Sequence, residues 1–198
     1  MAEVKNVGEK QYVNTKHLLT YNLNDQVEHA MLVSKLAYSV GKELGLDEET
    51  CQALFDAGQV HDIGKAELAS YVDEGKDSLL VEEMKYVRMH PKKGYEILKE
   101  RGYSDFVMET VLHHHENVDG SGYPDNLRGE AIPYGARILR VCDVFSALIA
   151  DRPYRKAFDE QTAIELMIDE IKNFDIKVFL AFQRVVHEGN YRNVVFSK

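Results

Sequence analysis

Apolar residues recur at steps of three and four positions through most of the chain, which is the pattern of amphipathic helices. In NDQVEHAMLVSKLAYSVGKELG, which begins at Asn24, this pattern runs without a break to Gly45. Asn24 is a typical helix N-cap and Gly45 a typical stop. Stretches in which apolar and polar residues strictly alternate, as in a half-buried strand, are almost absent. The chain is therefore predicted to be all-α.

The same spacing predicts further helices along the chain. The second begins at the N-cap Asp47, carries acids in its first turn and ends near Gly64. The others are expected at about 81–90, 92–101, 104–115, 133–150, 159–172 and 175–188.

Turn-forming residues mark the boundaries between these helices. Pro91, Pro124 and Pro133 fall where helical patterns begin or end. The segments 66–80 and 117–132 have the strongest turn chemistry and are expected to be loops. Because binding and catalytic residues often lie on loops of a helical scaffold, these two segments are candidates for the functional site.

Composition and length fit one globular domain. With 198 residues, of which 44% are apolar and 29% charged, the chain can bury a substantial core and is not of the disordered or fibrous class. We assign residues 24–198 to this domain and residues 1–23 to an N-terminal arm or cap.

Charge and apolar runs exclude several function classes. A net charge of -9 argues against binding long nucleic acid through a broad basic face. No apolar run approaches the roughly 18 residues of a membrane span, and the N-terminus lacks the apolar core of a signal peptide. Cys51 and Cys142 match no metal-binding or disulfide spacing. We expect them to be buried thiols in a cytoplasmic protein.

Histidines and acids occur on five of the predicted helices, from which they can converge on one point. They are His29, His61, Asp62, His90, His114, His115 and Asp143. Taken alone, each is more often a structural residue. Imidazole and carboxylate groups without thiolates favour iron, manganese, nickel or zinc over calcium. A carboxylate also bridges two ions about 3.5–4 Å apart, so the adjacent pair His61 and Asp62 suits two-metal phosphoester chemistry.

Five segments occur in the order found in one known family. They are HDIGK from His61, HPKKGYEIL from His90, HHENVDGSGYP from His114, IPYGARILRVCDVF from Ile132 and DRPYR from Asp151. Over about residues 25–188 the chain resembles the HD-GYP branch of the HD metal-dependent phosphohydrolases. This resemblance implies an HD-domain helical bundle with a C-terminal helical extension. It also implies hydrolysis of cyclic di-GMP, through a metal-activated hydroxide, to linear pGpG, GMP or both.

The resemblance also implies roles for individual residues. The seven histidines and aspartates named above match its metal ligands, which hold two or three divalent ions, iron or manganese first and zinc, nickel or cobalt as alternatives. Asp25 matches a position that helps to hold a third metal in some members, but a first-turn acid suits the helix dipole equally well. Asp62 and Lys65 are the implied catalytic residues. The implied substrate contacts are Lys65, Gly122, Tyr123, Arg152 and Arg155.

Some features fall outside the family pattern. His113 precedes the HHE motif and is expected to pack or lie on the surface, and His17 and His187 are expected to be structural. The segment 66–80 lacks the proline-containing sequence of many relatives, and Ser146 stands where they commonly have a second aspartate. Relatives also usually carry a sensory domain, for which the predicted arm is too short.

Several functions remain open at this point. The leading hypothesis is a cyclic di-GMP phosphodiesterase. The alternatives are an HD phosphohydrolase of another cyclic dinucleotide or nucleotide, a non-catalytic cyclic-dinucleotide receptor, and a helical domain with chance histidines. A homodimer, a diguanylate cyclase and a sensory domain are the protein partners that we consider.

Overall fold

The structure, a computed structural model, describes residues 23–66, 87–151 and 155–194. In these ranges every regular element is a helix, so the all-α prediction is confirmed. The α-helices are α2 Leu23–Glu43, α3 Glu48–Val60, α6 His90–Glu100, α7 Asp105–His113, α8 Tyr134–Leu148, α9 Glu160–Asp169 and α10 Ile176–Glu188. Short 3-10 helices cover Gly129–Ala131, Ile171–Asn173 and Asn190–Asn193. None of the helices in the described part is long and apolar enough to cross a membrane.

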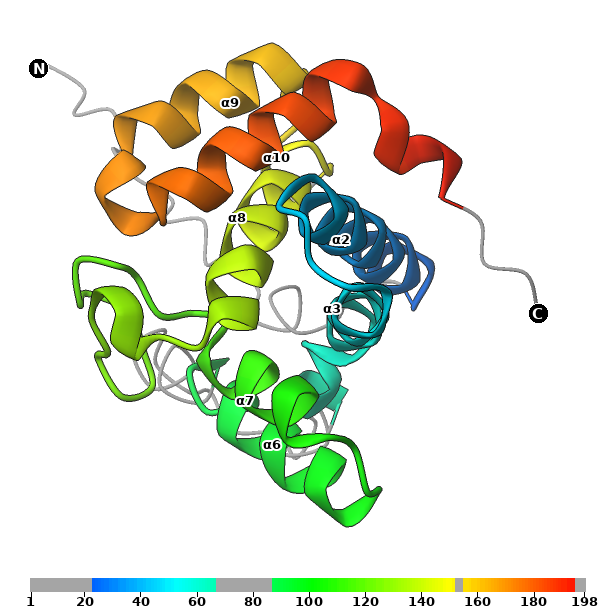
Figure 1. Ribbon diagram of the computed structural model, residues 1–198, viewed down its shortest axis with the longest axis vertical. Coiled ribbons are helices and arrows are strands. Elements are labelled where there is room, and N and C mark those ends of the chain that lie inside the picture. The colour runs from blue at the N-terminus through cyan, green and yellow to red at the C-terminus, as the bar shows by residue number, and fades with distance from the viewer. Residues whose placement is uncertain (1–22, 67–86, 152–154, 195–198) are drawn as a thin grey trace, which may run out of the picture.

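Helix α8 runs through the middle of the bundle (Figure 1). Helices α6 and α7 pair at one end, and α9 and α10 lie together at the other. Helix α2 packs against α3, α8 and α10, whereas α7 packs against α6, α3 and α8. The predicted C-terminal helical extension thus corresponds to α9 and α10. This arrangement lets side chains from α2, α3, α6, α7 and α8 meet on one side of the bundle.

The helices enclose one apolar core. Phe145 of α8 contacts Phe182 of α10 edge-on, with ring centroids 5.0 Å apart, and Leu36 and Leu139 are fully buried beside them. Full burial of one such side chain stabilises the fold by about 1.5–3 kcal/mol. Cys51 and Cys142 are both buried and unpaired, as predicted.

Most predicted helix ends lie within a few residues of the observed ends. The Asp47 carboxylate accepts a hydrogen bond from the Thr50 N–H at 2.7 Å, which confirms it as the N-cap of α3. Gly45 has a φ of 76°, which favours glycine and ends the run of α2. Ser104 caps α7 in the same way as Asp47 caps α3.

Two predicted boundaries beside the candidate metal ligands were wrong. Helix α3 ends at Val60, His61 and Asp62 form a turn, and the chain is helical again over 63–66. The predicted helix 104–115 ends at His113, so that the next two histidines leave the helix. In both places the backbone leaves the helix at the histidines that belong to the two candidate metal groups.

His90 begins a helix rather than ending one. The prediction placed it at the end of 81–90, most of which lies outside the described residues. Pro91 follows it in the first turn of α6, where a missing backbone N–H removes no helical hydrogen bond. His90 is therefore held at the start of α6, next to the turn after α3.

Candidate metal centre

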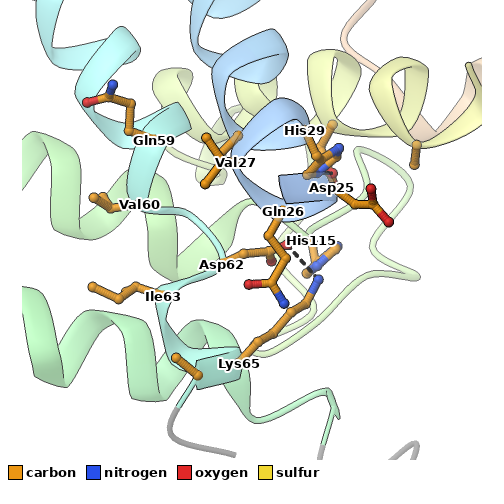
Figure 2. A pocket seen from close by; sticks show the side chains of 14 residues that line it. Asp25, Gln26, Val27, His29, Gln59, Val60, Asp62, Ile63, Lys65 and His115 are labelled. Atoms are coloured by element: carbon orange, nitrogen blue, oxygen red, sulfur yellow. Dashed lines mark hydrogen bonds and ion pairs between the residues drawn. The ribbon is translucent and has the colours of Figure 1, made fainter. Parts of the chain in front are cut away.

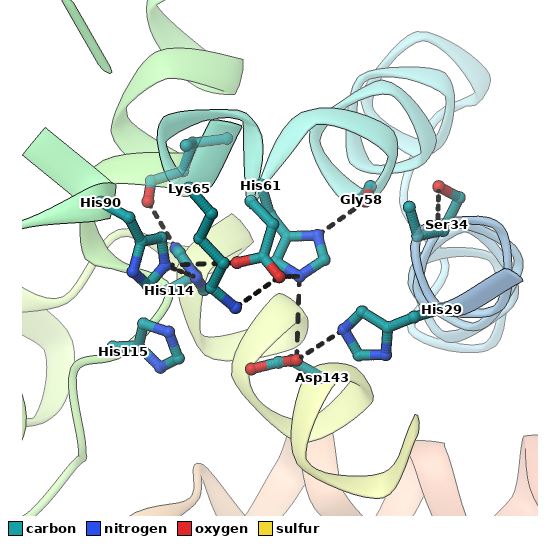
Figure 3. A network of polar contacts seen from close by, with 12 residues as sticks. His29, Ser34, Gly58, His61, Lys65, His90, His114, His115 and Asp143 are labelled. Carbon is teal, nitrogen blue, oxygen red and sulfur yellow. Dashed lines mark hydrogen bonds and ion pairs between the residues drawn. The ribbon is translucent and has the colours of Figure 1, made fainter. Parts of the chain in front are cut away.

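The structure brings all seven predicted metal ligands together (Figure 3). They form two groups, and within each group one ligand atom per residue lies within 4.8 Å of the others. Group one consists of Asp62, His90, His114 and His115, and group two of His29, His61 and Asp143. The residues come from α2, the turn after α3, the start of α6, the turn after α7, and α8.

Gly58 allows α2 and α3 to cross closely. A Cβ atom at this position would lie 2.6 Å from Cα of Ser34, nearer than real atoms approach. The close crossing sets His29 of α2 beside His61, with ring centroids 5.3 Å apart. Gly58 also accepts a hydrogen bond from His61 Nδ1 through its carbonyl, at 2.8 Å.

Gly64 of the HDIGK motif allows a second close approach. A Cβ atom there would clash with the His90 carbonyl oxygen and would lie 2.8 Å from the backbone nitrogen of Gly94. Because glycine has no Cβ, the segment 63–66 rests directly on the first turn of α6. This contact holds Asp62 Oδ1 3.3 Å from His90 Nε2.

Three of the histidines have the same tautomer. Nδ1 of each faces a backbone carbonyl three residues earlier: His61 to Gly58 at 2.8 Å, His90 to Val87 at 2.6 Å and His114 to Val111 at 2.6 Å. A carbonyl oxygen only accepts, so Nδ1 carries the ring hydrogen. In the neutral ring, Nε2 then presents a lone pair, which is the form that binds a metal ion.

These lone pairs face other acceptors. Nε2 of His90 and Nε2 of His114 lie 3.2 Å apart. His61 Nε2 and Asp62 Oδ1 are buried and have no hydrogen-bond partner within the described ranges. Buried polar atoms in a folded protein normally have partners, and acceptors this close repel each other unless a cation lies among them. The donor set of imidazole nitrogens and carboxylate oxygens therefore fits divalent metal ions of the iron, manganese or zinc type.

Protonation states also fit metal binding. Burial lowers the pKa of His61 and lowers the pKa of His114 well below its usual value, which favours neutral rings. Burial alone would raise the pKa of Asp62, but His61, Lys65 and His90 outweigh it and hold that pKa well below its usual range. For Asp143, burial acts the same way and is outweighed by the hydrogen bond with His29 and nearby imidazoles, so its pKa is also well below normal. Neutral imidazoles and ionised carboxylates are the forms that ligate metals.

Asp62 connects the two groups. One carboxylate oxygen, Oδ1, faces His90 of group one at 3.3 Å, and the other, Oδ2, lies 3.4 Å from His61 Nε2 of group two. Oδ2 also accepts a hydrogen bond from Lys65 Nζ at 2.6 Å. A carboxylate with its two oxygens turned to different groups has the orientation needed to bridge two ions.

A cavity of about 430 Å³ opens beside the two groups (Figure 2). Asp62, Lys65, His115 and Asp143 line it together with apolar residues of α2 and α3. Asp25 also lines the cavity, but it is exposed and belongs to neither group. The structure therefore brings Lys65 to the metal groups and leaves Asp25 at the edge of the cavity.

The GYP motif packs against the metal groups. The Tyr123 ring stacks on His115 with centroids 4.7 Å apart and planes 22° apart, and the Arg88 guanidinium lies over the Tyr123 ring, 5.2 Å from its centroid. Burial raises the pKa of Tyr123, so the phenol keeps its proton. Gly122 is buried, and a Cβ there would clash with the backbone of Asn117 and lie 2.5 Å from the His115 carbonyl oxygen. The glycine therefore sets Tyr123 against the histidines.

Sequence reasoning missed two residues of this site. Glu116 is buried, and its carboxylate accepts hydrogen bonds from the backbone N–H groups of Asp125 at 2.6 Å and Leu127 at 3.1 Å. Arg140 lies on α8 beside His115. The signals were present, since Glu116 completes the HHE motif and Arg140 precedes Asp143 by three residues on one helix face.

Arg155 lies elsewhere than expected. Its guanidinium donates hydrogen bonds to the carbonyls of Ala147, Leu148 and Lys156 at 2.8–2.9 Å and lies over the Phe158 ring. It therefore caps the end of α8 and is not among the residues that line the cavity. The last carbonyls of a helix have no partner within the helix, so they are free to accept hydrogen bonds from this guanidinium.

Several other expectations have structural outcomes. Arg152, His17 and nearly all of 66–80 lie outside the described residues. His113 is buried and lies 3.1 Å from the Glu109 carbonyl oxygen and 3.2 Å from an Asp125 carboxylate oxygen, so it packs as expected. Ser146 is buried on α8, and its hydroxyl has no hydrogen-bond partner in the described part of the chain. The exposed His187 lies in the last turn of α10 and in neither metal group.

Comparison with known proteins identifies the family. The family model described as HD domain matches residues 14–178. The chain belongs to the HD-domain family. Its HD signature is the pair His61 and Asp62, and each of the two residues belongs to a different one of the two groups.

Curated relatives of this HD domain are signalling phosphodiesterases. A cyclic di-GMP phosphodiesterase of Pseudomonas aeruginosa is 36% identical over 80% of this chain and 38% of its own length. The cyclic di-GMP phosphodiesterase response regulator RpfG of Xanthomonas campestris is 40% identical over 67% of this chain and 35% of its own. Matches named 3'3'-cGAMP-specific phosphodiesterases occur in Vibrio cholerae, one of them 34% identical over 77% of this chain. The predicted HD-GYP resemblance is thereby confirmed, and the chain spans little more than a third of these relatives' length.

Solved structures support the fold. An HDG"Y"P protein of Bdellovibrio bacteriovorus, Bd1817, superposes with a TM-score of 0.67 at 20% identity, over 86% of this chain and 55% of that protein. At this identity the likeness concerns the fold alone. The HD-domain helical bundle predicted from sequence is confirmed.

Proposed function

We propose that this HD domain is a metal-dependent phosphodiesterase that hydrolyses a cyclic dinucleotide, with cyclic di-GMP as its substrate. The observation that carries the proposal is the pair of metal-type groups joined by the two oxygens of Asp62. Named relatives that share this domain are phosphodiesterases of cyclic di-GMP or 3'3'-cGAMP. The proposed products are linear pGpG, GMP or both.

The proposed cofactors are two divalent ions, iron or manganese first, with zinc, nickel and cobalt as alternatives. His90, His114, His115 and Asp62 would hold one, and His29, His61 and Asp143, with Asp62 shared, the other. When bound, such ions supply Lewis acidity to phosphate oxygens and lower the pKa of coordinated water from about 15.7 toward about 7. A third ion would need Asp25, which lies at the cavity edge.

Lys65 neutralises charge on the substrate in this proposal. Its ammonium donates a hydrogen bond to Asp62 Oδ2 at 2.6 Å and lies at the wall of the cavity. Its positive charge there would stabilise a non-bridging phosphate oxygen as negative charge gathers on that oxygen during displacement. The salt bridge with Asp62 fixes the position of the ammonium next to the metal-type groups.

In this proposal Tyr123 holds the His115 ring in position and does not transfer a proton. Its raised pKa keeps the phenol neutral, and its stacking on His115 limits rotation of both rings. Tyr123 stays a proposed substrate contact through its ring edge or hydroxyl, because His115 stacks on the ring and the Arg88 guanidinium lies over it. Gly122 remains a proposed substrate contact through the family motif alone, since it is buried and its carbonyl accepts a hydrogen bond from the Asn126 side-chain amide.

The substrate base has two supported candidates. Relatives of similar identity are named for cyclic di-GMP and for 3'3'-cGAMP. A non-catalytic receptor is not favoured, since all seven expected ligands are present and lie together. Sensory-domain or diguanylate cyclase partners, a homodimer, the cytoplasmic location and the boundary of the domain at residue 24 stay predictions.

Turnover of cyclic di-GMP under anaerobic conditions tests this function. Protein reconstituted with Fe(II) or Mn(II) is expected to release linear dinucleotide or GMP, resolved by chromatography, with 3'3'-cGAMP as a competing substrate. Asp62→Ala is expected to lose turnover and to bind less metal, because it removes the shared carboxylate. Full activity in Asp62→Ala would contradict the bridging role, and metal binding without hydrolysis of either dinucleotide would contradict the proposed reaction.

A further inference from the structure

Arg140 is a partly buried basic residue beside His115, and no function has yet been assigned to it. It lies on α8 one turn before Asp143, is partly buried, and burial lowers the pKa of its guanidinium. No carboxylate of the described residues forms an ion pair with it. Arg137, one turn earlier on the same helix, is by contrast paired with Asp175 at 2.6 Å. The charge of Asp143 offsets part of the cost of burying this guanidinium, and an anion at its Nη groups would offset more.

The loop after α7 fixes the plane of this guanidinium. Nε of Arg140 donates to Asn117 Oδ1 at 3.0 Å, and the Asn117 amide in turn donates to Ser121 Oγ at 2.9 Å. Nη1 lies 3.5 Å from Nδ1 of His115, at the outer limit of a hydrogen bond. The guanidinium is thus held through Nε by Asn117. Among the described residues, the only hydrogen-bond contact of its Nη groups is the weak one between Nη1 and His115.

Metal ligation by His115 would release the Nη groups. A cation would bind His115 through Nε2, because Nδ1 lies next to the guanidinium charge. The neutral ring would then carry its hydrogen on Nδ1. Arginine has only donors, so Nδ1–H and Nη1–H cannot hydrogen-bond to each other. In that state Nη1 would have no hydrogen-bond acceptor among the described residues.

We propose that Arg140 binds a phosphate oxygen of the substrate through its Nη groups. This inference rests on the proposed function, since it assigns a phosphate contact within the same site. A phosphate offers acceptors and negative charge in the geometry that a guanidinium fork recognises. Tyr123 and His115 stack beside this position, and Lys65 lies at the neighbouring cavity. Neither Arg140 nor Arg155 lines the cavity beside Lys65, but Arg140 contacts His115, whereas Arg155 caps α8.

Equilibrium binding to Mn(II)-loaded protein tests the assignment, with cyclic di-GMP and inorganic phosphate as separate probes. Arg140→Gln is expected to bind both anions about 10-fold to 100-fold more weakly, as for loss of a charge-assisted hydrogen bond. Its metal content and melting temperature are expected to stay near those of the wild type. Arg137→Gln is the matched control from the same helix, and it is expected to lower the melting temperature without weakening anion binding.

The outcomes separate the two proposals. Unchanged anion binding in Arg140→Gln, with or without lower metal content, overturns the assignment, as does a wild type that binds neither anion. Weaker binding in the variant, together with a wild type that binds but hydrolyses no cyclic dinucleotide, supports Arg140 and overturns the proposed reaction. If Arg140→Gln does not fold, Arg140→Lys gives the same test: it keeps the charge but loses the fork, and wild-type affinity in it overturns the assignment.

Discussion

At the scale of the residue, small side chains decide whether the ligands can meet. Gly58 and Gly64 stand where a Cβ would collide with the backbone of a neighbouring segment. The first brings His29 to His61, and the second brings Asp62 to His90. The metal-type groups therefore depend on two residues that offer no ligand atom.

Gly64→Ala adds only one methyl group, but it is expected to destabilise the fold and weaken metal binding. The added methyl group would clash with the His90 carbonyl, and backbone atoms cannot move aside as flexible side chains do. We expect a loss of about 1–3 kcal/mol in the free energy of unfolding, measured by urea denaturation, and weaker metal binding. Gly94→Ala is the control, because its Cβ would lie 3.2 Å from the Val111 side chain, which can shift. Equal metal binding in both variants would contradict the role given to Gly64.

At the scale of the element, the segment between α7 and α8 is held from within. It contains only one short 3-10 helix, yet the single buried carboxylate of Glu116 accepts two backbone hydrogen bonds across it. A further backbone bond joins the N–H of Tyr123 to the carbonyl of His115 at 3.2 Å. This loop carries His115 and Tyr123, so its internal bonds fix the orientation of the site.

Glu116→Gln is expected to loosen this loop without changing the helices. The amide keeps one acceptor oxygen but turns an NH₂ group toward a backbone N–H, which leaves a buried donor without a partner. The expected cost is about 1–3 kcal/mol in the free energy of unfolding. Limited proteolysis would show faster cleavage within the loop, while far-ultraviolet circular dichroism would stay unchanged. Glu130→Gln, at an exposed position of the same connection, should leave the cleavage rate unaltered.

At the scale of the whole molecule, an acidic chain carries three basic side chains around its candidate metal centre. The net charge is -9, yet Lys65, Arg88 and Arg140 lie around the metal-type groups and Tyr123. Five helical elements meet there, so burial and protonation of the site are coupled to folding of the entire bundle.

The metal-free protein is expected to lose stability as the pH falls. Burial lowers the pKa of His61, His114 and His115 below the ordinary value of 6.5. Below that pH the unfolded chain takes up protons that the folded protein excludes, so the free energy of unfolding decreases by up to about 1.4 kcal/mol per pH unit for each imidazole. The depressed pKa of Asp62 adds stability above about pH 3.8, which is lost as the pH falls further.

Urea denaturation in the presence of a chelator, between about pH 8 and about pH 5, measures this slope. His114→Asn should give a shallower slope because it removes one excluded protonation. The same slope in wild type and variant would show that His114 titrates alike in the folded and unfolded states, contrary to its burial.

The sequence by itself determined the helical class and the family, and it predicted the seven candidate metal ligands that the fold brings together. Helical periodicity and caps such as Asp47 act over a few residues, so local pattern suffices to predict them. The motif from His61 to Lys65 and the HHE and GYP segments named the family before any geometry was known. Boundaries failed at His61 and His114, because the turns there are fixed by contacts with other helices.

Only the tertiary structure decided how these residues act together. Which carbonyl each imidazole faces, how the oxygens of Asp62 divide between two groups, and which arginine reaches the site depend on packing between segments far apart in the chain. Arg155 matched a motif position with a role yet caps α8, while Arg140, in the matching segment from Ile132 but without an implied role, lies beside His115. Local sequence pattern specifies elements, whereas the direction of a side chain at their junction follows from the close packing of the whole bundle.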